Sequence, residues 1–301
     1  MDTTKIITKI THYLGPLTPE ILAIIVGIIS TVIGTLTYDF IKSKKNKIKV
    51  KLIKESSDSD VEGFIELYNK LIDDKIRVET TEIISWIDED RVLRKINSHY
   101  YFHYLFVGKL KDKVVSFLKL MYSKNSCFMF IAYLGVDSTV DQARQNAGSL
   151  LIGKLTQLTK KELINCKAII CELEAPISGG DEKLNLERKA RIRHFKEMAK
   201  RHNYKFYEIQ FDYLQPQMEI PDNYIFSEEQ LILLYAPVND IQPLSQFISK
   251  DKLLDILQFL YLEIYRPTFR HDPIKDYAYQ NYLNNLLMLY KVNLPNDIKL
   301  K

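Results

Sequence analysis

The chain has few cysteines and glycines and no large excess of charge of either sign. Its 301 residues include 3 cysteines and 10 glycines, and its net charge is +4. Cys127, Cys166 and Cys171 form neither a C-x-x-C pair nor a zinc-ligand pattern, so we expect no metal site and a reducing compartment. The mild positive charge gives no argument for nucleic acid as a partner. At 46% hydrophobic and 27% charged residues, the composition is that of a folded protein.

The sequence also lacks two well-known phosphate-binding motifs, the Rossmann G-x-G-x-x-G and the Walker G-K-[ST]. It has instead an apolar, β-rich run at 127–137, then a polar loop, then Gln145-Asn146-Ala147-Gly148-Ser149-Leu150-Leu151. We predict a strand followed by a helix with Gly148 in its opening turn. The first amides of a helix have no internal partner and carry partial positive charge, so this turn predicts a phosphate site.

This strand and turn resemble the acetyl-CoA-binding core of the GNAT acetyltransferases. There a V-D-like pair leads into a Q/R-x-x-G-x-G/A loop that begins a helix. Gln145 to Gly148 match the first half of that motif, Leu150 stands where the second Gly or Ala belongs, and Arg144 offers a second register. The loop is longer than the usual one, by about residues 141–143.

The resemblance implies that acetyl-CoA is the co-substrate and assigns it a set of contacts. The backbone of Leu134, Gly135 and Val136 would line the pantetheine and the thioester. Arg144 would add positive charge to the pyrophosphate site. The pyrophosphate itself would be held by the amides of Gln145, Asn146, Ala147, Gly148 and Ser149. The alternative is structural: the two strand side chains are core residues and the glycine permits a tight turn.

The predicted order of elements supports the same resemblance. We predict strands at 46–54, 100–110, 113–122, 127–136, 168–173, 204–211 and 231–236, and helices at 58–73, 82–96, 148–163 and 186–202. The order β-α-α-β-β-β-α-β-α-β-β is that of the GNAT family. It implies a mixed α/β fold over residues 48–238, with a splayed sheet flanked by helices. Residues 212–216 (D-Y-L-Q-P) resemble a Y-[VL]-Q-P segment of an uncharacterised GNAT subgroup.

Residues 239–301 have a different pattern, with apolar and aromatic residues at helical spacing. We predict a helical extension that packs on the preceding domain. It could instead shape an acceptor pocket or a partner surface.

Near the N-terminus, residues 21–38 form a run of 18 residues without a charge. As a helix this run is about 27 Å long, which suits a bilayer core, so we predict a single-pass transmembrane helix at 19–41. Lysines are concentrated after the run, which predicts an outside N-terminus at 1–18, a basic tether at 42–47 and a cytoplasmic remainder at the cell membrane. A buried soluble helix is the alternative. Small residues at four-residue spacing leave homo-oligomerisation open.

For catalysis the resemblance requires a base and a proton donor. Glu172 and Glu174 share one face at the end of a strand, so either could be the base; they could also be solvent-facing carboxylates. The usual tyrosine donor is absent, because Ala199 or Phe195 occupies its place. Tyr213 is the nearest substitute by sequence. The basic helix at 186–202 could attract the cofactor, an acidic acceptor or the membrane surface.

Together these features predict a membrane-anchored GNAT-like acyltransferase. It would transfer acetyl from acetyl-CoA to an amine of an unknown acceptor. The alternatives are a catalytically impaired CoA-binding protein and a membrane scaffold or interaction protein.

Overall fold

The computed structural model describes residues 47–73, 77–95, 101–177, 179–216, 231–238, 246–266 and 273–301. Ile48 to Lys301 forms one compact unit. The predicted transmembrane helix at 19–41 and the predicted N-terminus at 1–18 lie outside the described residues. Within the described ranges, no helix combines the length and the apolar character that crossing a membrane requires.

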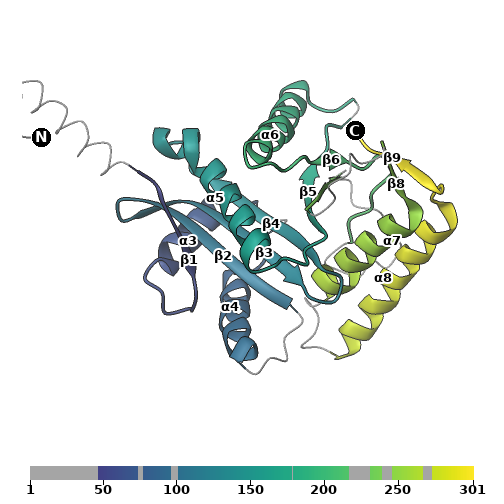
Figure 1. Cartoon of the computed structure of the whole chain (residues 1–301), viewed down its shortest axis with the longest axis horizontal. Coiled ribbons are helices and arrows are strands. Elements are labelled where there is room, and N and C mark those ends of the chain that lie inside the picture. The colour runs from purple at the N-terminus through teal and green to yellow at the C-terminus, as the bar shows by residue number, and fades with distance from the viewer. Residues whose placement is uncertain are drawn as a thin grey trace, which may run out of the picture. The chain divides into compact units, whose positions relative to one another are not determined.

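A seven-stranded mixed sheet forms the centre of this unit (Figure 1). All neighbouring strands are antiparallel except β4 and β5. In spatial order the strands are β1 (Lys49–Ile53), β2 (Tyr101–Leu110), β3 (Lys113–Ser123), β4 (Phe128–Val136), β5 (Ala168–Glu174), β7 (Leu231–Pro237) and β6 (Tyr207–Glu208). The helices among them are α3 (Val61–Leu71), α4 (Thr80–Lys95), α5 (Asp141–Lys161) and α6 (Glu182–Lys200). The predicted order of elements is therefore confirmed.

Helices cover both faces of the sheet because alternate strand residues are apolar on each face. On one face Ile131 and Ile169 pack with Leu151 and Leu155 of α5 and with residues of α6. On the other face α3 and α4 cover β1 to β3, where Phe64 meets buried strand residues. Figure 1 shows α5 and α6 on the opposite side of the sheet from α3 and α4.

The C-terminal region completes the second face. It comprises β8 (Phe247–Ser249), α7 (Lys250–Gln258), the π-helix η2 (Phe259–Tyr265), α8 (Pro273–Asn293) and β9 (Asp297–Lys299). Tyr261 and Tyr279 are fully buried and share one core with Phe128, Phe130 and Ile170 of the sheet. The expected packing of this helical extension on the sheet is confirmed, and the extension is a layer of the same fold.

Two elements differ most from the sequence-based prediction. Helix α5 begins at Asp141 and not at Gly148, because Ala143, Ala147 and Leu151 recur every four residues and are all fully buried. The strand predicted at 204–211 is only two residues long as β6. The residues after Tyr207 pair with the last residues of the chain, through backbone bonds between Glu208 and Lys301.

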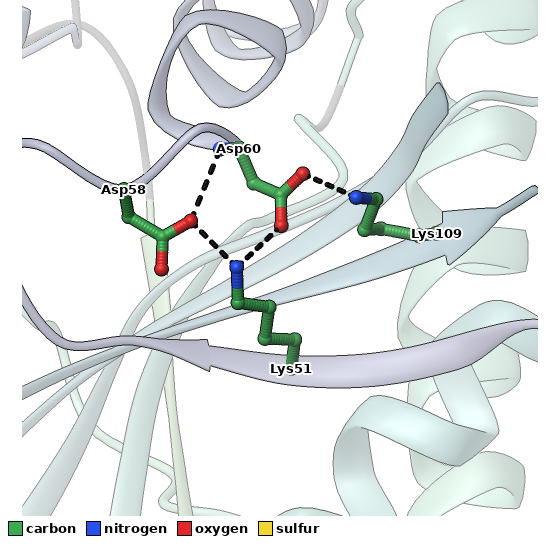
Figure 2. Close-up of polar contacts among 4 residues, drawn as sticks. All are labelled: Lys51, Asp58, Asp60 and Lys109. Carbon is green, nitrogen blue, oxygen red and sulfur yellow. Dashed lines mark hydrogen bonds and ion pairs between the residues drawn. The ribbon is translucent and has the colours of Figure 1, made fainter. Parts of the chain in front are cut away.

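An ion cluster joins the start of α3 to the outer strands (Figure 2). The carboxylate of Asp60 is buried and contacts Lys109 Nζ at 2.5 Å and Lys51 Nζ at 2.8 Å. Lys51 also contacts Asp58 at 2.6 Å, and Asp58 accepts the amide of Asp60 at 3.1 Å. Burial alone would raise the pKa of Asp60, but the hydrogen bonds from Lys109 and Lys51 outweigh it and leave that pKa below its usual value.

Replacing Asp60 by Asn should therefore destabilise the fold by about 1–2 kcal/mol at pH 7, because two lysines lose their shared carboxylate. The pKa of Asp60 is lower in the folded than in the unfolded chain. Its contribution is thus complete above about pH 4 and is lost as the pH falls further. Urea unfolding at pH 7 and along an acid series measures both effects. Asp112→Asn, in an exposed turn, is the control; an equal loss at every pH would contradict this account.

Candidate functional site

The sheet divides between β4 and β5. These strands pair only from Phe128 to Ile131 on β4 and from Ala168 to Cys171 on β5. Beyond that point β4 stays with β3, and β5 stays with β7. Ala132 is an extra residue in β4, since Leu120 pairs with Ile131 while Lys119 pairs with Tyr133. Such a bulge bends its strand, which accounts for the fork and leaves backbone groups of β4 facing it.

A cavity of about 380 Å³ lies at this fork, between the parted strands and helices α5 and α6. Most of its wall is apolar, with basic side chains added by the two helices. The lining residues include Ala132, Leu134, Val136, Leu173, Arg144, Gly148, Arg191, His194, Phe195 and Met198. The members from α6 recur at three- and four-residue spacing. The sequence analysis did not predict Arg191, His194 or Met198 as cavity residues, although their helical spacing is a signal that could have identified them.

The structure separates the three predicted residues of β4. Leu134 and Val136 line the cavity, as the resemblance implied for this segment. Gly135 is buried and turned toward the other face, where an added Cβ would lie 2.3 Å from Cε1 of Phe117. Its lack of a side chain is thus explained by packing against the fully buried Phe117 ring.

The structure contradicts the prediction that the amides of residues 145–149 are available to hold a pyrophosphate. Residues Gln145 to Ser149 lie inside α5, where amides bond to carbonyls four residues earlier. The first such bond joins the amide of Arg144 to the carbonyl of Val140 at 2.9 Å. The amides that a helix start leaves without an internal partner therefore belong to residues 141–143.

The side chains of the same five residues are also dispersed. Ala147 is buried, Gln145 and Asn146 are exposed, and Ser149 contacts Nε2 of His202 at 3.0 Å. Only Gly148 lines the cavity, together with Arg144. An added Cβ at Gly148 would lie 2.7 Å from Sδ of Met198 and 3.7 Å from Cγ2 of Val136. The absence of a side chain at Gly148 thus allows Met198 of α6 to pack close to α5 at the cavity wall.

The turn before α5 is fixed by a buried aspartate. Asp137 accepts both the amide and the hydroxyl of Thr139, at 3.2 and 2.6 Å, and its carboxylate contacts Lys70 at 3.1 Å. The hydrogen bond from the Thr139 hydroxyl and the contact with Lys70 hold the pKa of Asp137 below its usual value, although burial opposes them. This turn holds the start of α5 beside the cavity, where Ser138 is one of its lining residues.

Glu172 is the carboxylate at the fork. It lines the cavity, and its two oxygens accept hydrogen bonds from the hydroxyls of Tyr213 and, at 2.5 Å, Tyr265. The side chain of Gln215 donates in turn to the Tyr265 hydroxyl at 2.9 Å. Burial raises the pKa of Glu172 to about 6, although both tyrosines lower it. A carboxylate with this pKa can accept a proton near neutral pH.

Glu174, the other predicted base, has different surroundings. Its carboxylate contacts Arg191 at 2.9 Å and Arg188 at 3.4 Å, and both arginines come from α6. Arg188 is itself buried and donates to the carbonyl of Ala175 at 3.1 Å. This arrangement anchors α6 to the end of β5, and of the two carboxylates only Glu172 lines the cavity.

Tyr213, the predicted proton donor, is not among the residues that line the cavity. Its hydroxyl is committed to Glu172, and burial followed by the nearby Glu172 charge raises its pKa well above the usual value. The Tyr213 hydroxyl therefore holds the Glu172 carboxylate in place. Two residues were predicted to occupy the position of the usual tyrosine proton donor. Of these, Phe195 lines the cavity and Ala199 is buried. No group of three or more His, Cys, Asp or Glu within the described ranges could hold a metal.

No family model matches this chain, and no curated protein matches it. Several solved structures are similar to it. A Bacteroides thetaiotaomicron protein described as a GNAT-family acetyltransferase is 16% identical, with a TM-score of 0.44, covering 71% of this chain and 97% of its own. A Desulfovibrio desulfuricans protein described in the same way is 11% identical, with a TM-score of 0.40, covering 63% and 98%.

A third similar structure is yncA from Salmonella typhimurium, described as an acetyltransferase with its cofactor acetyl-CoA. It is 11% identical with a TM-score of 0.40, covering 66% of this chain and 98% of its own. All three superpositions are loose and the identities are low.

Replacing Tyr265 by Phe should raise the pKa of Glu172 above about 6, because one of two hydrogen bonds to the carboxylate is lost. We expect a shift of roughly half to one pH unit. Carboxyl NMR titration of the labelled protein measures it without any assumption about activity. Tyr207→Phe, at the edge of the sheet beside Lys205, is the control. An unchanged titration in Tyr265→Phe would show that this hydroxyl does not support the carboxylate.

Proposed function

We propose that this protein is an acetyltransferase that moves the acetyl group of acetyl-CoA to an amine. The observation that carries the proposal is the placement of Glu172. A carboxylate with a pKa of about 6 lines a largely apolar cavity, at the point where two parallel strands separate. A transfer site of this kind needs a base, a channel for a thioester and a place for phosphates, and the fork has a candidate for each.

The cavity suits a ligand with an apolar arm and an anionic end. Leu134, Val136 and Met198 would border the arm, and the strand backbone facing the fork would polarise the thioester carbonyl. The diphosphate would lie at the true start of α5, at residues 141–143, where helix amides and the dipole favour anions. Arg144 lines the same end of the cavity and adds charge.

In the proposed transfer step, Glu172 acts as the base. The acceptor amine loses a proton to the carboxylate, and its nitrogen forms a bond to the carbonyl carbon of the thioester. The carbon–sulfur bond then breaks, the thiolate leaves and takes up a proton from water to give free CoA, and Glu172 returns its proton to water. Tyr213 and Tyr265 hold the carboxylate in place throughout and keep their own protons.

We further propose that residues 19–41 anchor the protein in the cell membrane as a single span with the described domain in the cytoplasm. The support is the uncharged run at 21–38 and the lysines after it. The acceptor would then be an amine that can reach the inner membrane surface. The basic character of α6 would favour the approach of the anionic co-substrate.

The base assignment is tested by comparing Glu172→Gln with Glu174→Gln. Acetyl-CoA turnover, followed as thiol release with and without a panel of amines, should fall roughly 100-fold or more in Glu172→Gln. Calorimetry should show nearly unchanged acetyl-CoA affinity, and Glu174→Gln should keep most of the rate. In the wild type the rate should be half-maximal near pH 6, the pKa of Glu172, and should level off about one pH unit higher.

Two results would count against this proposal in different ways. A wild-type rate in Glu172→Gln would refute the base while leaving the co-substrate in place. Failure of the wild-type chain to bind acetyl-CoA would refute the proposed function itself.

The co-substrate site is tested by replacing Gly148 with Leu. The new side chain would enter the cavity beside Met198 and Val136, so acetyl-CoA affinity should fall roughly tenfold or more. Gly153→Leu is the matched control. It lies on the same helix against α6, with its Cβ 3.0 Å from Cε1 of His202, and it is not among the cavity's lining residues. Equal affinities for the two variants, each checked for folding by circular dichroism, would remove Gly148 from the site.

A further inference from the structure

Helix α8 exposes an unusual amount of apolar surface. The ten large hydrophobic side chains that are exposed within the described ranges include five on this helix. Their exposed fractions are 82% for Ile274, 69% for Tyr277, 56% for Met288, 47% for Leu289 and 74% for Val292. Single exposed apolar residues are common, but a run of them along one helix is typical of an interaction surface.

Three of these residues, Ile274, Met288 and Val292, belong to one uncharged seam along α8. The opposite side of the helix buries Tyr279, Leu283 and Leu286 in the domain's own core. The exposed seam alternates four- and three-residue steps, which is the spacing of a helix that packs along another helix. Its members are Ile274, Ala278, Asn281, Asn285, Met288 and Val292, all exposed and none charged.

We propose that this seam pairs with the same seam of a second copy of the chain, with the two helices antiparallel. The seam has the same pattern from either end, about a midpoint at Leu283. Ile274 of one copy then meets Val292 of the other, and the small Ala278 meets the long Met288. A twofold interface requires such self-complementarity, and a small residue opposite a large one fills the space between helices.

The centre of the seam specifies the register. In the antiparallel arrangement Asn281 of each copy faces Asn285 of the other, so their amides can hydrogen-bond across the axis. Buried asparagines at seam positions fix register and partner number in paired helices. In a parallel arrangement Ala278 would face itself and leave a gap, while two Met288 side chains would crowd each other.

The charges beside the seam and the surface area of the seam are both consistent with pairing to a second copy of the chain. The flanking Lys291 would face Tyr277 of the other copy, and no two like charges would meet along the seam. The exposed seam side chains offer roughly 500–600 Å² of surface per copy, so two copies would bury about 1,100 Å², near the lower limit for a specific interface. We therefore expect a dimer with a dissociation constant in the micromolar range. A lipid surface would favour many basic residues beside the apolar stripe, which the asparagine-rich α8 does not offer.

Cross-linking of introduced cysteines in the full chain, purified in mild detergent, tests the arrangement. Asn284→Cys lies beside the twofold axis and should cross-link with itself through a short bismaleimide. Ile274→Cys should fail to cross-link with itself but should cross-link with Val292→Cys when the two proteins are mixed. The wild type gives the background, which comes from the partly exposed Cys127, since Cys166 and Cys171 are buried. Self-cross-linking of Ile274→Cys, or none by Asn284→Cys, would overturn the antiparallel pair.

Sedimentation equilibrium tests the dimer itself. Met288→Asp should weaken association at least tenfold, because a charge would be buried in the seam. Leu186→Asp, on α6 and 60% exposed in the wild type, should leave it unchanged. A monomer at all concentrations up to about 100 μM would overturn the proposal.

Discussion

The separation of β4 from β5 is the constraint on which the rest of this molecule depends. Four residues on each strand pair in parallel, and then the bulge at Ala132 turns β4 away while β5 continues against β7. Parallel strands of a covered sheet normally have no room for a ligand between them. Here the fork provides such room: backbone of β4 faces it, the cavity opens beside it, and Glu172 lies at its edge.

The position of the Glu172 carboxylate at the fork depends on residues that are far apart in the sequence. Glu172 comes from β5, Tyr213 from the segment after β6, and Tyr265 from the end of η2. The segment carrying Tyr213 is fixed in turn by α8, because Tyr290 accepts the amide of Leu214 at 2.7 Å and donates to the carbonyl of Asp212 at 2.8 Å. The C-terminal extension is thus part of the wall that determines the protonation of Glu172.

Much of the fold could be predicted from the sequence because apolar periodicity is local. The run at 127–137 identified β4, and the ordering of strands and helices identified the sheet. The start of α5 was missed because Gly148 was interpreted as the first turn, although Ala143, Ala147 and Leu151 repeat at helical spacing. Glu172 could be selected from strand alternation. Its partner Tyr265 could not, because it lies 93 residues further along the chain and only tertiary packing brings the two together.

The π-helix η2 has a consequence for how this protein can change over evolutionary time. Seven residues, Phe259 to Tyr265, continue α7 with a wider turn than an α-helix has. Each residue of an α-helix advances by about 100°, so losing one residue here would rotate Tyr265 away from β5. Insertions and deletions in this segment would therefore alter the pKa of Glu172 without changing the identity of any residue at the fork. Comparison of homologues by helix length could show a divergence that comparison by residue identity would overlook.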